Sequence, residues 1–254
     1  MKFDALVVAG AKNTGALKDY SNKKYESLIE IAAKPMVQHV IEAVENVNEI
    51  NDIVIVGPEK INQKTNSKYR IIKPEDVLIN NIKKGIDALN HDHHILIITS
   101  DIPLITTKII EDFINKCKLE KRHDLFYPVI SKEINLEKYP EVERTYVHLK
   151  EGIFTGGNMV LVSPEIIQGP LDWYDKILNL RKKPFKMSQM LGFKFIVKFI
   201  FRQLSIKEVE KRISNIIGHK CKALIVEYPE IGFDVDKPSD LKMMKEKYLK
   251  AFDI

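Results

Sequence analysis

The sequence predicts a three-layer α/β sandwich with a mostly parallel central sheet. Short apolar runs of strand length alternate with stretches whose apolar residues recur at helical spacing, which is typical of βαβ units. Several runs are apolar throughout, as expected of strands covered by helices on both faces. The chain has 254 residues, 44% of them hydrophobic, which is enough for one large core. We therefore expect a single domain over residues 1–254.

The first expected strand covers residues 5–9 and continues into a loop of small residues at 10–15. Pro35 suits the first turn of the helix that follows, and apolar residues recur at helical spacing as far as Val44. Further strands are expected at residues 52–56, 71–72, 95–101, 124–129, 144–149, 158–162 and 222–226, and further helices at 77–89, 109–114 and 237–249.

A segment of different character interrupts this pattern, and we expect a helical insert at about residues 173–217. Within it, residues 191–202 are mostly apolar with a cation at every fourth position, Lys194, Lys198 and Arg202. The preferred interpretation is a docking helix with an exposed basic stripe. The alternatives are a homodimer contact and a helix that lies on a membrane surface as a peripheral contact.

Composition and charge narrow the class of protein. The formal net charge of +5 suits an anionic small-molecule substrate but is too small, and the lysines too dispersed, to indicate nucleic-acid binding. The two cysteines lack the spacing of a disulfide framework or a zinc site. No signal peptide and no apolar stretch of about 18 residues is present, so we expect a cytoplasmic protein.

Asp101 is the strongest candidate for a functional residue. It ends the apolar run at 95–101, and Pro103 prevents the strand from continuing. Open α/β sheets bind their ligands at the carboxyl ends of their strands, and a carboxylate there is a natural ligand for Mg²⁺. The alternative is that Asp101 only caps the following turn or helix.

Asp234 and Asp236 form a second acidic feature near the end of the chain. They are one residue apart, so their side chains point the same way on an extended backbone. Together with Asp101 they would form a carboxylate site for one or two divalent ions.

Three further features suit phosphate or sugar binding. The loop at 10–15 would let backbone N–H groups approach a phosphate, although it is neither a Walker loop nor a dinucleotide fingerprint. Lys34 precedes a helix and would reach a phosphate as a mobile charge, or else it is an ordinary surface lysine. Gly157 and Asn158 lead into a strand and would contact a ligand, unless they form a simple turn.

In their order and spacing these segments resemble the nucleoside-triphosphate transferase superfamily, in particular its MobA-like, molybdenum-cofactor guanylyltransferase-like branch. The matching segments are residues 6–15, residues 28–35 with their Lys-Pro, residues 99–104 with Ser-Asp-Ile-Pro-Leu, residues 155–160 and residues 233–241.

The resemblance implies a Rossmann-like, GT-A-type fold and Mg²⁺-dependent transfer of an NMP from an NTP to a small phosphorylated acceptor, with release of pyrophosphate. It also implies a role for individual residues. Ala9, Gly10, Ala11 and Lys12 would cradle the triphosphate, with Lys12 and Lys34 as catalytic cations; Asn80 and Asn81 would lie near the base; Asp101, Asp234 and Asp236 would hold Mg²⁺; Arg144, Gly157 and Asn158 would line the acceptor side.

The chain departs from the family pattern in two places. Lys12 is the nearest cation in a loop that usually carries an arginine, and Glu26 stands where the family usually has a lysine, with Lys23 and Lys24 close by. Two alternatives therefore stay open: a GT-A-type glycosyltransferase that uses a nucleotide-sugar, and a non-catalytic nucleotide-binding module.

Overall fold

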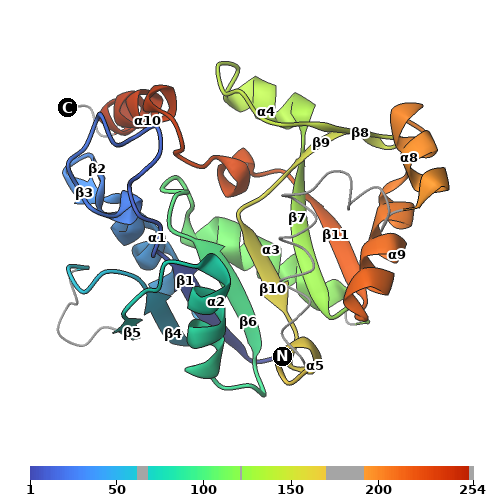
Figure 1. The fold of residues 1–254 in the computed structure, drawn as a ribbon, viewed down its shortest axis with the longest axis horizontal. Coiled ribbons are helices and arrows are strands. Elements are labelled where there is room, and N and C mark those ends of the chain that lie inside the picture. Colours follow the sequence, from blue (N-terminus) through green and yellow to red (C-terminus); the bar gives the residue numbers. More distant parts are fainter. Residues whose placement is uncertain (62–67, 121, 170–191, 252–254) are drawn as a thin grey trace.

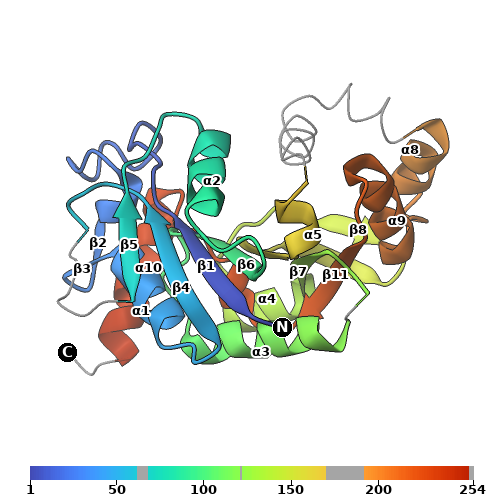
Figure 2. The same cartoon turned by 90° about the horizontal axis from the view of Figure 1, so that it is seen from below.

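The computed structural model describes residues 1–61, 68–120, 122–169 and 192–251, and these residues form an α/β fold (Figures 1 and 2). The strands are β1 (Phe3–Val8), β2 (Glu30–Ile31), β3 (Lys34–Pro35), β4 (Ile50–Val56), β5 (Tyr69–Ile72), β6 (His94–Thr99), β7 (Leu125–Ser131), β8 (Val147–Leu149), β9 (Gly152–Gly156), β10 (Met159–Val162) and β11 (Cys221–Val226). The helices are η1 (Glu26–Leu28), α1 (Met36–Glu45), α2 (Leu78–Asp87), α3 (Thr107–Leu119), α4 (Lys132–Lys138), α5 (Pro164–Ile167), α8 (Phe193–Ile200), α9 (Ile206–Ile217), η2 (Pro229–Gly232) and α10 (Pro238–Ala251).

A nine-stranded sheet forms the centre of the described part of the chain. Its order is β5-β4-β1-β6-β10-β7-β9-β8, and β11 pairs with β7. Strands β5, β4, β1 and β6 are parallel, β11 is parallel to β7, and β10 and β9 run in the opposite direction. Most strands thus share one direction, and the predicted fold class is confirmed.

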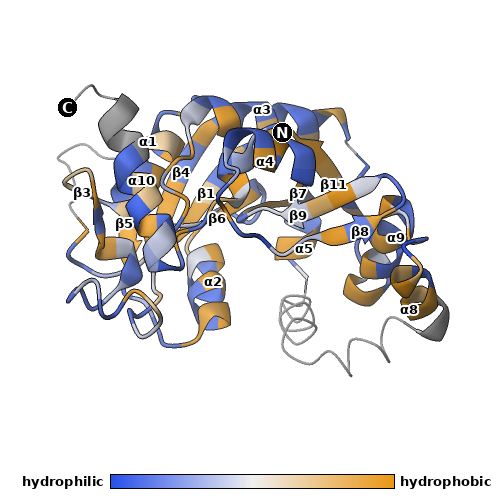
Figure 3. Ribbon diagram, turned by 90° about the horizontal axis from the view of Figure 1, so that it is seen from above, coloured by the Kyte–Doolittle hydropathy of each residue, from blue (hydrophilic) through white to orange (hydrophobic). Residues whose placement is uncertain are grey.

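Alternation along the strands produces three layers. In β1, Ala5 and Val7 face the helices α1 and α3, whereas Leu6 and Val8 face α2. The two sets belong to separate hydrophobic cores, one on each face of the sheet, and Figure 3 shows the apolar colour concentrated along the strands between the helices. The near-continuous apolar sequence of the central strands follows from this burial on both faces.

A third, smaller core lies beneath the segment that precedes α10. It is built from residues of the 17–36 region, the loop after α4, the segment that leads into α10, and α10 itself. Its buried members are Leu17, Ile29, Ile31, Met36, Tyr139, Val142, Phe233, Val235, Leu241 and Met244. This core anchors chain segments that are far apart in the sequence near the carboxyl end of β6.

Most element boundaries agree with the sequence, and three strands differ. The run expected at 144–149 forms a strand only from Val147, and the residues before it line a surface hollow. The strand expected to reach Asp101 ends at Thr99, so Asp101 lies in the turn that follows. Strand β9 was not expected, since its sequence has little of the alternation typical of strands.

The helical insert expected at 173–217 is described only from residue 192 onward, where it contains α8 and α9; residues 173–191 lie outside the described residues. Phe199, Ile200 and Phe201 at the end of α8 are exposed, and Figure 3 shows this end in the hydrophobic colour. In the described part of the chain, no helix is both long and apolar enough to cross a bilayer. Peripheral membrane contact through 191–202 and a homodimer contact both stay predictions.

Gly85 tests the packing of α2 on the sheet. A Cβ at this position would lie 2.2 Å from Leu6 Cδ1, so Gly85→Ala should lower the free energy of unfolding by about 1–3 kcal/mol, although alanine is the better helix former. In a Leu6→Ala background the same change should be neutral or stabilising, because its steric partner is gone. Urea denaturation of the four variants measures both effects, and a Gly85→Ala cost that persists without Leu6 would contradict this packing.

Candidate active site

Three aspartates meet at the carboxyl end of β6. Asp101 lies two residues beyond the strand, and Asp234 and Asp236 lie between η2 and α10. One carboxylate oxygen from each lies within 4.8 Å of those of the other two. We call these residues the acid cluster. The fold thus brings together residues that are up to 135 positions apart in the sequence. They meet at the edge where open α/β sheets bind ligands.

Alternation of the backbone directs Asp234 and Asp236 toward Asp101. Phe233 and Val235 are buried in the third core, so the residues between and after them face away from it. The backbone N–H of Val235 donates to the Asp101 carbonyl over 2.9 Å, which ties the two segments together. The burial of two apolar side chains therefore fixes the position of two charged ones.

The Asp101 carboxylate is oriented by neighbouring side chains. Thr99 Oγ1 donates to Asp101 Oδ1, and Asn158 Nδ2 lies 3.4 Å from the same oxygen. The Asn158 backbone joins three elements, because its carbonyl accepts from the Thr99 N–H and its own N–H donates to the Ile231 carbonyl over 2.8 Å. Asn158 thus links β6, β10 and η2 next to the acid cluster.

The electrostatics of the acid cluster favour a cation. Burial raises the pKa of Asp101, and the charge of Asp234 raises it further. Burial, followed by the charges of Asp234 and Asp101, raises the pKa of Asp236 to about 6. Burial and the charge of Asp101 raise the pKa of Glu26 too, so its carboxyl group lies near the acid cluster. Among the described residues, Arg144 is the only cation that forms an ion pair with the acid cluster, and it donates to Asp234 Oδ1.

The small-residue loop lies beside this region and is held by hydrogen bonds. Ala9 N–H donates to the Val56 carbonyl over 2.8 Å, and Ser27 Oγ donates to the Ala9 carbonyl over 2.8 Å. The Glu26 N–H donates to the Ala11 carbonyl over 3.1 Å. These bonds hold Glu26 and Ser27 directly beside the loop.

Gly10 permits a close approach between this loop and the segment that precedes α2. A Cβ at Gly10 would lie 2.7 Å from both Asn81 Nδ2 and Pro74 Cβ. Lys12 forms an ion pair with Asp76 in the same segment. The predicted triphosphate loop and the predicted base region are therefore in direct contact.

The two asparagines expected near the base are both engaged with Glu75. Asn81 is buried and accepts from the Glu75 N–H over 2.6 Å, while its amide donates to the Glu75 carbonyl over 3.0 Å. Asn80 Nδ2 donates to the Glu75 carboxylate over 2.8 Å. Asn81 thus fixes the backbone of this segment rather than presenting a free amide.

Two other predicted site residues have evident structural partners. Lys34 Nζ lies 2.7 Å from Glu42 Oε2 on α1. A Cβ at Gly157 would lie 2.5 Å from Ile231 Cγ2 and 2.9 Å from Pro128 Cγ, so protein atoms fill the space that the sequence interpretation left for a ligand. The catalytic role of Lys34 and the substrate role of Gly157 stay predictions.

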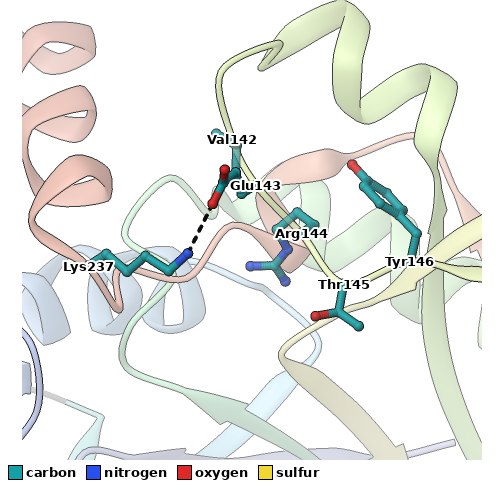
Figure 4. A pocket seen from close by; sticks show the side chains of 6 residues that line it. All are labelled: Val142, Glu143, Arg144, Thr145, Tyr146 and Lys237. Carbon is teal, nitrogen blue, oxygen red and sulfur yellow. Dashed lines mark hydrogen bonds and ion pairs between the residues drawn. The ribbon is translucent and has the colours of Figure 1, made fainter.

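A surface hollow of about 440 Å³ adjoins the acid cluster (Figure 4). Val142, Glu143, Arg144, Thr145, Tyr146 and Lys237 line it, and we call it the Arg144 hollow. Arg144 connects the two features through its ion pair with Asp234, and Lys237 directly follows Asp236 in the chain. The predicted metal ligands and the predicted acceptor residue therefore share one region.

The sequence analysis did not identify two residues of this region. Thr99 orients Asp101, and Lys237 lines the Arg144 hollow. Each lies within two residues of a recognised aspartate, so proximity in the sequence was an available signal. Glu26, which the sequence analysis had noted in place of a lysine, lies close enough to Asp101 for that charge to raise its pKa together with burial.

Comparison with known proteins identifies the family of the chain. Residues 22–183 match the MobA-like NTP transferase domain. A stretch of 105 residues, 40% of this chain, is 29% identical to the bifunctional protein GlmU of Thermoanaerobacter pseudethanolicus and spans 23% of that protein's length.

Solved structures show the same fold. A hypothetical transferase from Thermus thermophilus superposes with a TM-score of 0.82 at 29% identity, over 95% of this chain and all of that one. CMP:2-keto-3-deoxy-manno-octonic acid synthetase complexed with CTP superposes with a TM-score of 0.62 over the full length of both chains, a likeness of fold alone at 12% identity. The guanylyltransferase-like branch stays a prediction. Since the domain match covers well over half of its length, the chain belongs to the MobA-like NTP transferase family and is a nucleotidyltransferase.

Proposed function

We propose that this protein transfers an NMP from an NTP to a small phosphorylated acceptor, with Mg²⁺ held by the acid cluster and pyrophosphate released. The observation that carries the proposal is the convergence of Asp101, Asp234 and Asp236 beside the small-residue loop and the Arg144 hollow. One side of the acid cluster would then receive the nucleotide and the other the acceptor.

The residues present fit Mg²⁺. The ion prefers carboxylate oxygens and substrate phosphates, and the three carboxylates lie close enough to share it or to bind it partly through water. Burial and then the charges of Asp234 and Asp101 raise the pKa of Asp236, and a bound cation would offset both effects. When bound, Mg²⁺ would neutralise charge on the phosphates during transfer.

The chain itself would position the two substrates. The loop around Gly10 would offer backbone N–H groups to the triphosphate, and Lys12 would leave Asp76 to balance phosphate charge. Asn158, which already donates to Asp101, would keep that carboxylate in place. Asn81 would act on the base through the backbone that it holds near Glu75. Lys34 would contribute only after it leaves Glu42.

Pyrophosphate release tests the reaction. Wild-type protein would be mixed with each of the four NTPs, Mg²⁺ and a panel of sugar and alcohol phosphates, and Asp101→Asn should reduce the rate for the active pair by about 10²-fold or more. Asp87→Asn is a matched control, since Asp87 is an exposed aspartate at the far end of α2.

The outcome separates the rival activities. Release of a nucleoside diphosphate from a nucleotide-sugar, with no pyrophosphate from any NTP pair, would favour a glycosyltransferase. Tight NTP binding without turnover and without Mg²⁺ dependence would favour a non-catalytic module. An Asp101→Asn variant as active as Asp87→Asn would contradict the proposed site.

The stability of the metal-free protein should depend on Asp236. Its folded-state pKa of about 6 exceeds the usual value of about 3.9, so its ionisation disfavours folding as the pH rises from about 4 to 6. Asp236→Asn should therefore raise the melting temperature at pH 7.5 by about 2–4 °C, or roughly 1 kcal/mol, because part of the Asp236 side chain is exposed and solvent weakens the effect of its burial. The gain should shrink toward pH 4.5.

Thermal unfolding in the presence of a chelator measures this effect, with Asp87→Asn as control. In excess Mg²⁺ the order should reverse, because only the wild type keeps all three carboxylates. Equal melting temperatures of wild type and Asp236→Asn at pH 7.5 without metal would show that burial and neighbouring charges do not destabilise the ionised Asp236 carboxylate.

Gly10 and Gly15 provide a matched pair for the nucleotide loop. A methyl group at Gly10 would meet Asn81 and Pro74 at 2.7 Å, whereas one at Gly15 would meet only Glu26 Oε1 at 3.5 Å. Gly10→Ala should displace the loop and weaken NTP binding by about tenfold, while Gly15→Ala should bind within a factor of about two. Titration calorimetry with NTP and Mg²⁺ measures both, and equal affinities would show that this contact does not shape the nucleotide site.

A further inference from the structure

Two cations line the Arg144 hollow, and each is already paired with a carboxylate. Arg144 donates to Asp234 Oδ1, and Lys237 Nζ lies 3.4 Å from Glu143 Oε2. Thr145 and Tyr146 also line the hollow, and Figure 4 shows the Arg144 guanidinium between Lys237 and Thr145. The hollow thus has the groups that bind a phosphate, but its charge is balanced while both pairs are intact.

The two ion pairs differ in strength. Glu143 and Lys237 have side chains 88% and 55% exposed, so water screens their interaction and an entering anion would displace it easily. Arg144 and Asp234 have side chains only 13% and 21% exposed, so their interaction is less screened. The Arg144 pair is therefore the contact that controls whether the hollow can attract an anion.

Asp234 belongs to both features. It is the partner of Arg144 and also a member of the acid cluster proposed to bind a divalent cation. A cation at the acid cluster would compete for the Asp234 carboxylate and would add two positive charges beside an excess of carboxylates. Both effects would leave the planar guanidinium able to bind a phosphate through two parallel hydrogen bonds.

We propose that the Arg144 hollow binds the phosphate group of the acceptor, and that Arg144 couples this binding to occupancy of the acid cluster by the divalent cation. The inference rests on the proposed function and adds to it a location for the acceptor and a dependence of acceptor binding on the metal. The Arg144 hollow has a volume of about 440 Å³, which suits a small sugar or alcohol phosphate. By linkage, the phosphate must strengthen metal binding by the same factor.

Titration calorimetry on the full chain tests the coupling without turnover. The probes are MgCl₂ alone, then inorganic phosphate and glycerol phosphate, each with and without saturating Mg²⁺; acetate tests whether a carboxylate suffices. Wild type should bind either phosphate at least about tenfold more tightly with Mg²⁺ than without it. Weaker binding of acetate under both conditions is expected, and acetate binding equal to that of phosphate would overturn the assignment to a phosphate group.

Three variants distinguish coupling from a purely structural role of Arg144. Arg144→Gln should abolish the Mg²⁺-dependent gain in phosphate affinity, and Arg144→Lys should keep part of it because the charge remains without the planar fork. Asp234→Asn should bind phosphate more tightly than wild type when no metal is present, since Arg144 loses its partner. Lys207→Gln, which removes an exposed cation on α9, should behave as wild type.

The two failures are distinguishable. If MgCl₂ does not bind wild type in an Asp101-dependent manner, the proposed function fails. If Mg²⁺ binds but the phosphate affinity of wild type is the same with and without it, or Asp234→Asn leaves the metal-free phosphate affinity unchanged, the coupling fails and the metal site stands.

Discussion

The structure of the site depends on holding carboxylates together that repel one another. Burial raises the pKa of Asp236 to about 6, and the neighbouring charges of Asp234 and Asp101 add to the shift. The protein overcomes this repulsion with contacts outside the acid cluster, namely the burial of Phe233 and Val235 and the bond from Val235 N–H to the Asp101 carbonyl. The apolar core beneath α10 therefore maintains an electrostatic arrangement that the charges alone would disperse. A site kept under such repulsion is ready for a cation before one arrives.

The sheet explains why so many chain segments meet at this point. β7 pairs with β10 near its start and with β9 near its end. Residues 157 and 158 therefore connect two strands that lie along the same strand β7. Gly157 permits the close approach of Ile231, and Asn158 uses its backbone to join β6 to η2 while its side chain reaches Asp101. The glycine and the asparagine at this position thus shape the backbone next to the acid cluster, and the asparagine also helps to orient Asp101. Gly157 is required because a side chain there would collide with neighbouring protein atoms, and Asn158 contacts the acid cluster directly.

How much could be predicted from the sequence differs between the fold and the site. The fold could be predicted from local patterns. The apolar runs of β1, β4 and β6 and the helical spacing of apolar residues in α1 each indicate burial within a single short segment. The proximity of Asp101 to Asp234 and Asp236 was inferred from alternation and from the family order, and the structure shows the three together. The partners of those residues could not be inferred. The Arg144–Asp234 ion pair and the hydrogen bonds between Asn81 and Glu75 depend on the three-dimensional packing of these segments. Neither contact produces a periodic pattern in the sequence.

Glu26 connects the departure from the family pattern with the electrostatics of the site. A lysine at this position would balance part of the triphosphate charge, whereas a glutamate adds to the charge of the acid cluster, and burial and Asp101 raise its pKa. Its neighbours limit what can compensate, because Lys23 pairs with Glu30 and Lys12 with Asp76. In the proposed reaction, neutralisation of an incoming triphosphate would then come from the divalent cation, together with a lysine that exchanges its carboxylate for a phosphate. A site with fewer fixed cations would depend more on a bound metal, which is also the condition under which a metal-dependent Arg144 would have the greatest effect on acceptor binding.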